Sequence, residues 1–93
     1  MEKDKFIDEI CKANNLDVDK LKSNYRQPPY QDIRRIAIYA LNDKFDMIPN
    51  RIKEFMNKRS HSSVIKSIQV HEDLIRFNKK YRELYEVNIK IIG

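Results

Sequence analysis

The sequence predicts an all-α protein, a compact domain of five or six helices. Apolar residues recur at intervals of three and four along most of the chain, the spacing of one helical face. Its 93 residues include one Gly and three Pro, fewer than the turns of a small β-rich domain require. With 41% apolar and 35% charged residues, the composition is that of a single globular domain, 1–93.

Two helices are expected to open the chain. The first spans residues 4–14, and its apolar face consists of Phe6, Ile7, Ile10 and Cys11. A short second helix is expected over residues 17–23, DVDKLKS, with Asp17 as its N-cap. The inward-facing residues of this second helix are Val18 and Leu21.

A loop precedes the strongest helical pattern in the chain. Residues 24–30, NYRQPPY, contain Pro28 and Pro29, which exclude a helix interior and leave an exposed, basic loop. Residues 30–45 then carry an unbroken apolar stripe at helical spacing. The stripe consists of Ile33, Ile36, Ala37, Ala40, Leu41 and Phe45.

The second half of the chain predicts three further helices. Pro49 suits the first position of a short helix that directs Ile52, and either Phe55 or Met56, inward. After a tight connection, Ser60 is a good N-cap, because its hydroxyl can accept the backbone N–H near Ser63. This helix is expected to run to about Phe77, with Val64 and Ile68 facing the core and Ile65 as a further candidate. A last helix carries Tyr81, Leu84, Tyr85 and Ile89.

The net charge of +5 is concentrated in the middle of the chain. Residues 25–66 carry nine cations and four anions, whereas the segments on either side are nearly neutral. A localised positive field attracts a polyanion, and nucleic acid is the first candidate. The alternative is a solvated face of mixed charge, which the charge count alone does not exclude.

Catalytic and metal-binding patterns are weak. Cys11 has no second cysteine for an internal disulfide and no metal motif, and it is expected in the core. A single cysteine fits a reducing compartment, and the expected localisation is cytoplasmic, near the nucleoid. His61 with a neighbouring serine lacks an orienting acid, so we expect no enzyme and no cofactor, metal or small-molecule substrate. His71 is expected at the flank of its helix, and Arg35 either as an unpaired surface cation or as part of a site.

Residues 49–68 have the pattern of a helix-turn-helix. A short helix, a basic turn and a helix that begins with small polar residues follow one another. His61, Ser62 and Ser63 are short enough for close approach to base edges, and Lys58, Arg59 and Lys66 suit phosphates. The same residues also fit an ordinary capped helix, and both interpretations stay open on this pattern alone.

Several segments resemble the C-terminal DNA-binding domain of DnaA, the bacterial replication initiator. RSHSSVIKSI is similar to that family's signature RDHTTVxxAx, and IRRIAIYAL is similar to its xRQIAMYLx helix. The segment PNRIKEFMNKRSH parallels PEIGxxFGxRDH with one residue inserted. The resemblance spans the whole chain and is to the DNA-binding domain alone, without the family's ATPase module. It implies an all-α, Trp-repressor-like fold that contains a helix-turn-helix.

The resemblance also implies which residues contact double-stranded DNA. Arg59, Ser60, His61, Ser62 and Ser63 occupy the signature positions, with Lys58 and Lys66 on either side. Arg26 in the loop is the candidate for an arginine that enters the minor groove, and Arg34 matches an arginine able to contact phosphate. Ser60 replaces the family's aspartate. The preferred DNA sequence is therefore expected to differ from the short DNA box that the family binds, or to be read less strictly.

The expected function is therefore sequence-preferring DNA binding, in replication initiation, its regulation or transcription, with replication proteins as further possible partners. The alternative is a helical protein-interaction module that kept the scaffold and lost base reading. DNA binding predicts cations clustered beside the start of the helix at residue 61. A partner module predicts an exposed apolar patch and scattered cations.

Overall fold

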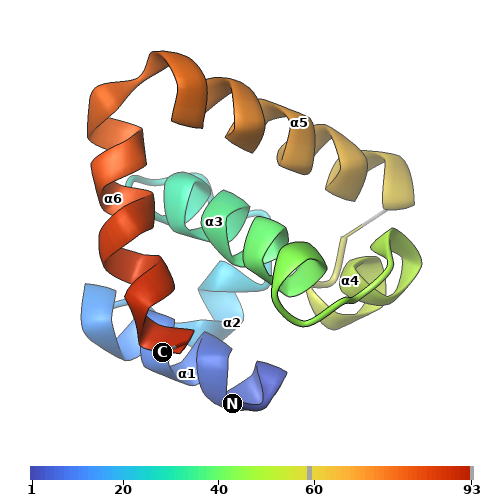
Figure 1. The fold of residues 1–93 in the computed structure, drawn as a ribbon. Helices are drawn as coiled ribbons and strands as arrows, with labels where there is room; N and C mark the ends of the chain where they lie inside the picture. The colour runs from blue at the N-terminus through green and yellow to red at the C-terminus, as the bar shows by residue number, and fades with distance from the viewer. Residues whose placement is uncertain (59, 93) are drawn as a thin grey trace.

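A computed structural model describes residues 1–58 and 60–92, and this part of the chain contains helices and no strand (Figure 1). The helices are α1 (Lys3–Asn14), α2 (Val18–Leu21), α3 (Tyr30–Asp43), α4 (Pro49–Phe55), α5 (His61–Phe77) and α6 (Lys79–Ile89), followed by the 3-10 helix η1 (Lys90–Ile92). The all-α prediction of five or six helices is confirmed.

Helix α3 lies at the centre of the molecule and contacts every other α-helix (Figure 1). It is buried on more than one face, because Ile38 is inaccessible to solvent as well as the predicted stripe. A helix buried on more than one face lies inside a fold, and the polar residues of α3 gather mainly toward its two ends. Truncating a core residue such as Ile36 to Ala is expected to cost roughly 2–5 kcal/mol of stability.

The other helices supply one buried face each to the same core. The residues that they bury are Phe6, Ile7, Ile10 and Cys11 from α1, Leu21 from α2, Ile52 from α4, Val64 from α5 and Tyr81 from α6, with Met56 just after α4. The predicted core positions of α1, α2 and α4 are thus confirmed, and Met56 rather than Phe55 is the more deeply buried of the two alternatives.

Three helices begin at residues whose side chains cap them. Asp17 accepts the backbone N–H of Lys20 at 3.1 Å, and Ser60 accepts that of Ser63 at 3.3 Å, as the sequence predicted. Asn78 ends α5 and begins α6, where its side chain accepts the N–H of Tyr81 at 3.0 Å. Such caps satisfy N–H groups that the first helical turn leaves unpaired.

The predicted positions of Phe45 and His71 differ from the structure. Helix α3 ends at Asp43, and Phe45 lies beyond it, half-buried, with its ring 5.4 Å from that of Phe6. His71 was expected at the flank of its helix, but it is buried, with 1% of its surface exposed. Periodicity did not reveal this burial, because imidazole is a polar side chain that enters a core only when a partner there bonds it.

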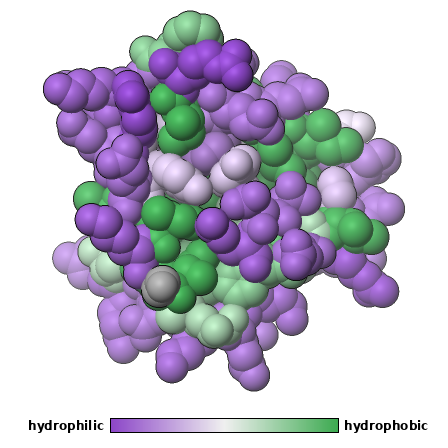
Figure 2. Space-filling view, in the orientation of Figure 1, coloured by the Kyte–Doolittle hydropathy of each residue, from purple (hydrophilic) through white to green (hydrophobic). Residues whose placement is uncertain are grey.

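The surface shows no broad apolar area on the face in view in Figure 2. Hydrophobic side chains reach that surface in several patches that hydrophilic side chains interrupt. The large exposed hydrophobic residues among those described are spread over the N-terminus, the start of α4, both ends of α5, and α6, and they are Met1, Ile48, Ile65, Phe77 and Val87. Within residues 1–58 and 60–92, no helix combines the length and the apolar character needed to cross a membrane.

Candidate nucleic-acid interface

Helices α4 and α5 pack against each other across a tight connection (Figure 1). Buried Ile52, Met56 and Val64 bind the two helices to the core, so their mutual orientation is fixed by packing. Asn57 has a φ of 53°, the left-handed conformation that asparagine tolerates better than most residues and that reverses the chain after a helix. The backbone N–H of Lys58 closes this turn on the carbonyl of Lys53 at 2.9 Å.

The start of α5 is exposed on the outside of this helix pair. Ser60, His61, Ser62 and Lys66 are all exposed to solvent. The first turn of α5 carries no acidic residue, so nothing there repels an anion from the positive end of the helix dipole. Ser60 has a structural task as the N-cap, which explains its presence without a base contact.

A polar hollow adjoins this exposed turn, with a volume of about 350 Å³. Four parts of the chain line it, namely the loop after α2, the first half of α3, the turn before α5 and the first half of α5. The lining residues are Asn24, Arg26, Gln31, Arg34, Arg35, Lys58, Ser63 and Ser67. All are polar or charged, and no carboxylate is among these described lining residues. We call this set of residues the polar hollow.

The polar hollow brings four cations together. Burial and the charge of Arg34 both lower the pKa of Lys58, which shows that the ammonium group lies in a partly desolvated, positive environment. Bringing like charges together costs free energy unless an anion offsets it. A site of this kind therefore favours a phosphate group, and its hydrogen-bond donors suit phosphate oxygens.

Arg34 is placed differently from the exposed phosphate contact that the sequence suggested. It is only 5% exposed, and its guanidinium donates hydrogen bonds to three backbone carbonyls. The acceptors are Leu21 at 2.6 Å, Lys20 at 2.8 Å and Tyr25 at 2.9 Å. Lys20 and Leu21 are the last residues of α2, where helical partners run out, and Tyr25 lies in the loop that follows. Arg34 therefore fixes the end of α2 and the start of the loop, while a contact with phosphate stays a prediction.

The loop that carries Arg26 is anchored at both ends. The rings of Tyr25 and Tyr30 meet edge to face, with their centroids 4.8 Å apart. The hydroxyl of Tyr30 accepts the backbone N–H of Asp17 at 3.0 Å, which ties the loop to the start of α2. Arg26 itself is exposed and reaches the rim of the polar hollow. A held loop presents its arginine at lower entropic cost than a free one.

Sequence reasoning missed four residues of the polar hollow as site residues. Arg35 was left between two interpretations, and it now lines the hollow and pairs with Asp32 at 3.0 Å. The others are Asn24, Gln31 and Ser67. Helical spacing could have found two of them, since Gln31 lies four residues before Arg35 and Ser67 lies four after Ser63.

The predicted site residues therefore fall into two adjoining groups. Arg26, Arg34, Lys58 and Ser63 meet in the polar hollow, and His61, Ser62 and Lys66 lie on the exposed surface of α5. Ile65, a candidate for the core, is 39% exposed and lies on the same helix as His61, Ser62 and Lys66. Arg59, a further predicted contact, lies outside the described residues.

Comparison with known proteins assigns this arrangement to a family. The family described as bacterial DnaA protein helix-turn-helix matches residues 4–70, which is more than half of the chain. The chain belongs to this family, and its helix-turn-helix is a DNA-binding unit. The match includes α1 to α4 and the first part of α5, so it contains the whole polar hollow. No curated protein matches the chain.

Proposed function

We propose that this chain binds double-stranded DNA with a preference for particular sequences and places the start of α5 in the major groove. One observation carries the proposal: the acid-free first turn of α5 and the cationic polar hollow lie beside each other. A groove-reading helix needs both features, because phosphate contacts position it and side chains at its start read base edges.

His61 and Ser62 are the proposed base-reading residues. Both are exposed at the first turn of α5, and Lys66 follows Ser62 by one helical turn. Imidazole and hydroxyl groups can donate or accept hydrogen bonds at base edges in the major groove. The exposed side chain of Ile65 lies on the same surface and suits an apolar contact with a thymine methyl group.

Arg26, Arg35 and Lys58 are the proposed phosphate-binding residues of the polar hollow. Their positions on the loop, α3 and the turn before α5 let them follow a curved phosphate backbone. Arg26 is the most exposed of these cations, which supports the alternative in which its guanidinium enters the minor groove. Arg59 and Ser63 complete the proposed contacts from the family signature.

The biological role that we propose is in replication initiation, its regulation or transcriptional control. A domain that binds DNA without itself hydrolysing nucleotide acts by marking sites, competing for them or covering them. The clustering of cations supports this role over a protein-interaction module, for which scattered cations and one broad apolar patch were expected. Instead, the large exposed apolar residues among those described are spread over the N-terminus, the start of α4, α5 and α6.

The test is selection of bound duplexes from a random library at moderate salt, followed by sequencing. We expect one enriched motif and an affinity that falls steeply with salt, with a log–log slope of about 0.9 per phosphate contacted. The control is a chain with Arg26→Gln and Lys58→Gln, which should retain far less DNA. Failure to retain any duplex would contradict the proposal, and binding without an enriched motif would remove its sequence preference.

A further inference from the structure

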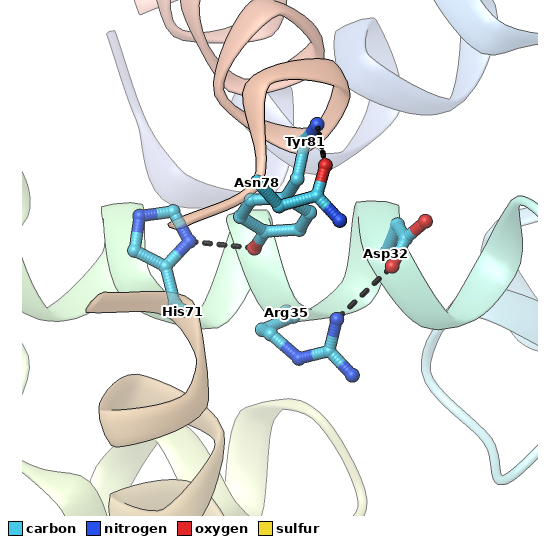
Figure 3. A network of polar contacts seen from close by, with 5 residues as sticks. All are labelled: Asp32, Arg35, His71, Asn78 and Tyr81. Carbon is cyan, nitrogen blue, oxygen red and sulfur yellow. Dashed lines mark hydrogen bonds and ion pairs between the residues drawn. The ribbon is translucent and has the colours of Figure 1, made fainter. Parts of the chain in front are cut away.

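Arg35 of the polar hollow lies beside a group of polar contacts that reaches into the interior (Figure 3). Its Nη1 donates to Asp32 on the same helix at 3.0 Å, and its guanidinium lies 5.8 Å from the centre of the Tyr81 ring. Tyr81 comes from α6, and its hydroxyl lies 2.6 Å from Nδ1 of His71 on α5. Three helices therefore meet around one surface arginine.

The pair with Asp32 is too weak to fix Arg35 alone. Asp32 is half exposed, with 49% of its side chain accessible, and the two residues are three apart on one helix. Ion pairs of this kind contribute little because water screens them and the side chains lose entropy. A second support is needed if the guanidinium is to keep one orientation.

Tyr81 is a rigid support. It is 4% exposed, its ring is part of the core, and its backbone N–H is held by the side chain of Asn78. The guanidinium carbon of Arg35 lies 5.8 Å from the centre of the Tyr81 ring, within the range of a cation–π contact. Burial raises the pKa of Tyr81, and the positive charge of Arg35 acts in the opposite direction.

His71 in turn fixes the Tyr81 hydroxyl. The imidazole is buried, stacks on the Tyr39 ring at 4.0 Å and meets the Tyr85 ring edge-on at 4.8 Å. Packing on both sides holds its ring plane, so Nδ1 keeps a constant position for the hydroxyl of Tyr81. The same burial keeps the imidazole neutral near pH 7, so no second positive charge repels Arg35.

We propose that Tyr81 is a positioning residue for DNA binding. It holds Arg35 in the polar hollow in the orientation that accepts a phosphate, so α6 adds to DNA affinity without touching DNA. The inference rests on the proposed DNA-binding function. Arginine loses much side-chain freedom when it binds, and holding it beforehand removes part of that cost. Tyr81 lies outside the segment that the family match covers.

The test compares Tyr81→Phe with Tyr85→Phe, each alone and combined with Arg35→Gln. Both Tyr changes remove one hydroxyl from the same aromatic cluster. The Tyr81 hydroxyl pairs with His71 and so fixes the ring beside Arg35, and its loss should free that ring. Affinity for a selected duplex is measured at several salt concentrations. We expect Arg35→Gln to lower affinity about tenfold and to reduce the salt slope by about 1. We expect Tyr81→Phe to lower affinity about threefold.

The double variant decides between positioning and a general effect on folding. If Tyr81 acts through Arg35, Tyr81→Phe should have no further effect once Arg35→Gln is present, whereas independent changes multiply. Tyr85→Phe should leave affinity unchanged in both backgrounds. A threefold loss from Tyr81→Phe that persists without Arg35, or no loss at all, would overturn the inference.

A measurement on the unaltered protein covers the case in which Tyr81→Phe does not fold. The order parameter of the Arg35 Nε–H bond, from ¹⁵N relaxation without DNA, should be clearly higher than that of Arg26 on the exposed loop. Equal mobility of the two side chains would overturn the inference. If the unaltered protein binds DNA and Arg35→Gln has no effect, this inference alone fails. If the unaltered protein binds no duplex, the proposed function fails with it.

Discussion

The two halves of α5 have opposite environments. Residues 61–67 carry exposed His61 and Ser62 and have one side on the polar hollow. Residues 71–77 begin with buried His71, which contacts aromatic rings from α3 and α6. The acidic residues of α5, Glu72 and Asp73, also lie in this second half. One helix thus presents an open cationic end and an anchored end.

The difference shows how a helix can read DNA and still be rigid. The base-reading side chains must stay exposed, so in residues 61–67 only Val64 on the opposite face is fully buried. The far end can be buried, and a helix is stiff enough to transmit the constraint along its length. Here the anchor includes a buried hydrogen bond between His71 and Tyr81 and a shared cap at Asn78. The two ends of α5 can be perturbed separately.

Acidification should weaken the anchored end. Burial, with a smaller contribution from Arg35, lowers the pKa of His71 to about 4, below the ordinary value of 6.5 for a histidine. As pH falls, the unfolded state therefore binds the proton first, and stability is lost between about pH 6.5 and pH 4. The expected loss is about 3 kcal/mol, measured by urea unfolding at a series of pH values.

His71→Leu should remove this contribution to the pH dependence, because it takes away the titrating group. His61→Ala is the matched control on the same helix, since that imidazole is exposed at the open end. It should lose as much stability on acidification as the unaltered protein does. Equal pH dependence in His71→Leu and the unaltered protein would contradict the assignment.

Neutralising the cations of the polar hollow should weaken the open end. The combination of Arg26→Gln and Lys58→Gln is expected to lower DNA affinity about 100-fold, since each charged hydrogen bond contributes roughly 1.5 kcal/mol. The salt slope should fall by about 2, equally for all sequences. Titration of selected and random duplexes measures both. The free energy of unfolding should stay within about 0.5 kcal/mol, and a larger change would indicate a structural role.

Removing a base-reading side chain should change discrimination more than overall affinity. His61→Ala or Ser62→Ala is expected to cost roughly 1–3 kcal/mol of preference for the selected duplex over a random one. Competition binding with the two duplexes measures the ratio. Gln69, which is exposed further along α5, offers a control, because Gln69→Ala should keep the preference. An unchanged ratio in both His61→Ala and Ser62→Ala would remove these residues from the proposed contacts.

Ser60 allows a test of capping apart from reading. Ser60→Ala removes the acceptor of the Ser63 N–H and should cost about 1 kcal/mol of stability in thermal or urea unfolding. Ser60→Asp should retain stability, because aspartate is an equally good cap and favours the helix dipole. It should also alter base preference, since a carboxylate accepts from cytosine N4. Equal stability of Ser60→Ala and the unaltered protein would contradict the capping role.

Much of the fold followed from local rules. Periodicity located the helices, and Asp17, Ser60 and Pro49 marked three of their starts, because caps and Pro at the first position act within a few residues. The site was predicted less completely. The signature residues gave the surface of α5, but Arg35 and Asn24 entered the site only because α3, α5 and the loop meet. Arg34 was interpreted as a surface contact because its carbonyl partners lie 9 to 14 residues away.

Sequence alone was enough to predict the helices, the caps Asp17 and Ser60, the apolar stripe of α3 and the concentration of positive charge in residues 25–66. Each of these depends on residues close together in the chain or on composition. Tertiary structure alone decided which cations share the polar hollow, that Arg34 is buried and that His71 pairs with Tyr81. The physical reason is that desolvation and hydrogen bonding depend on which groups surround a side chain in space, and those groups come from distant segments.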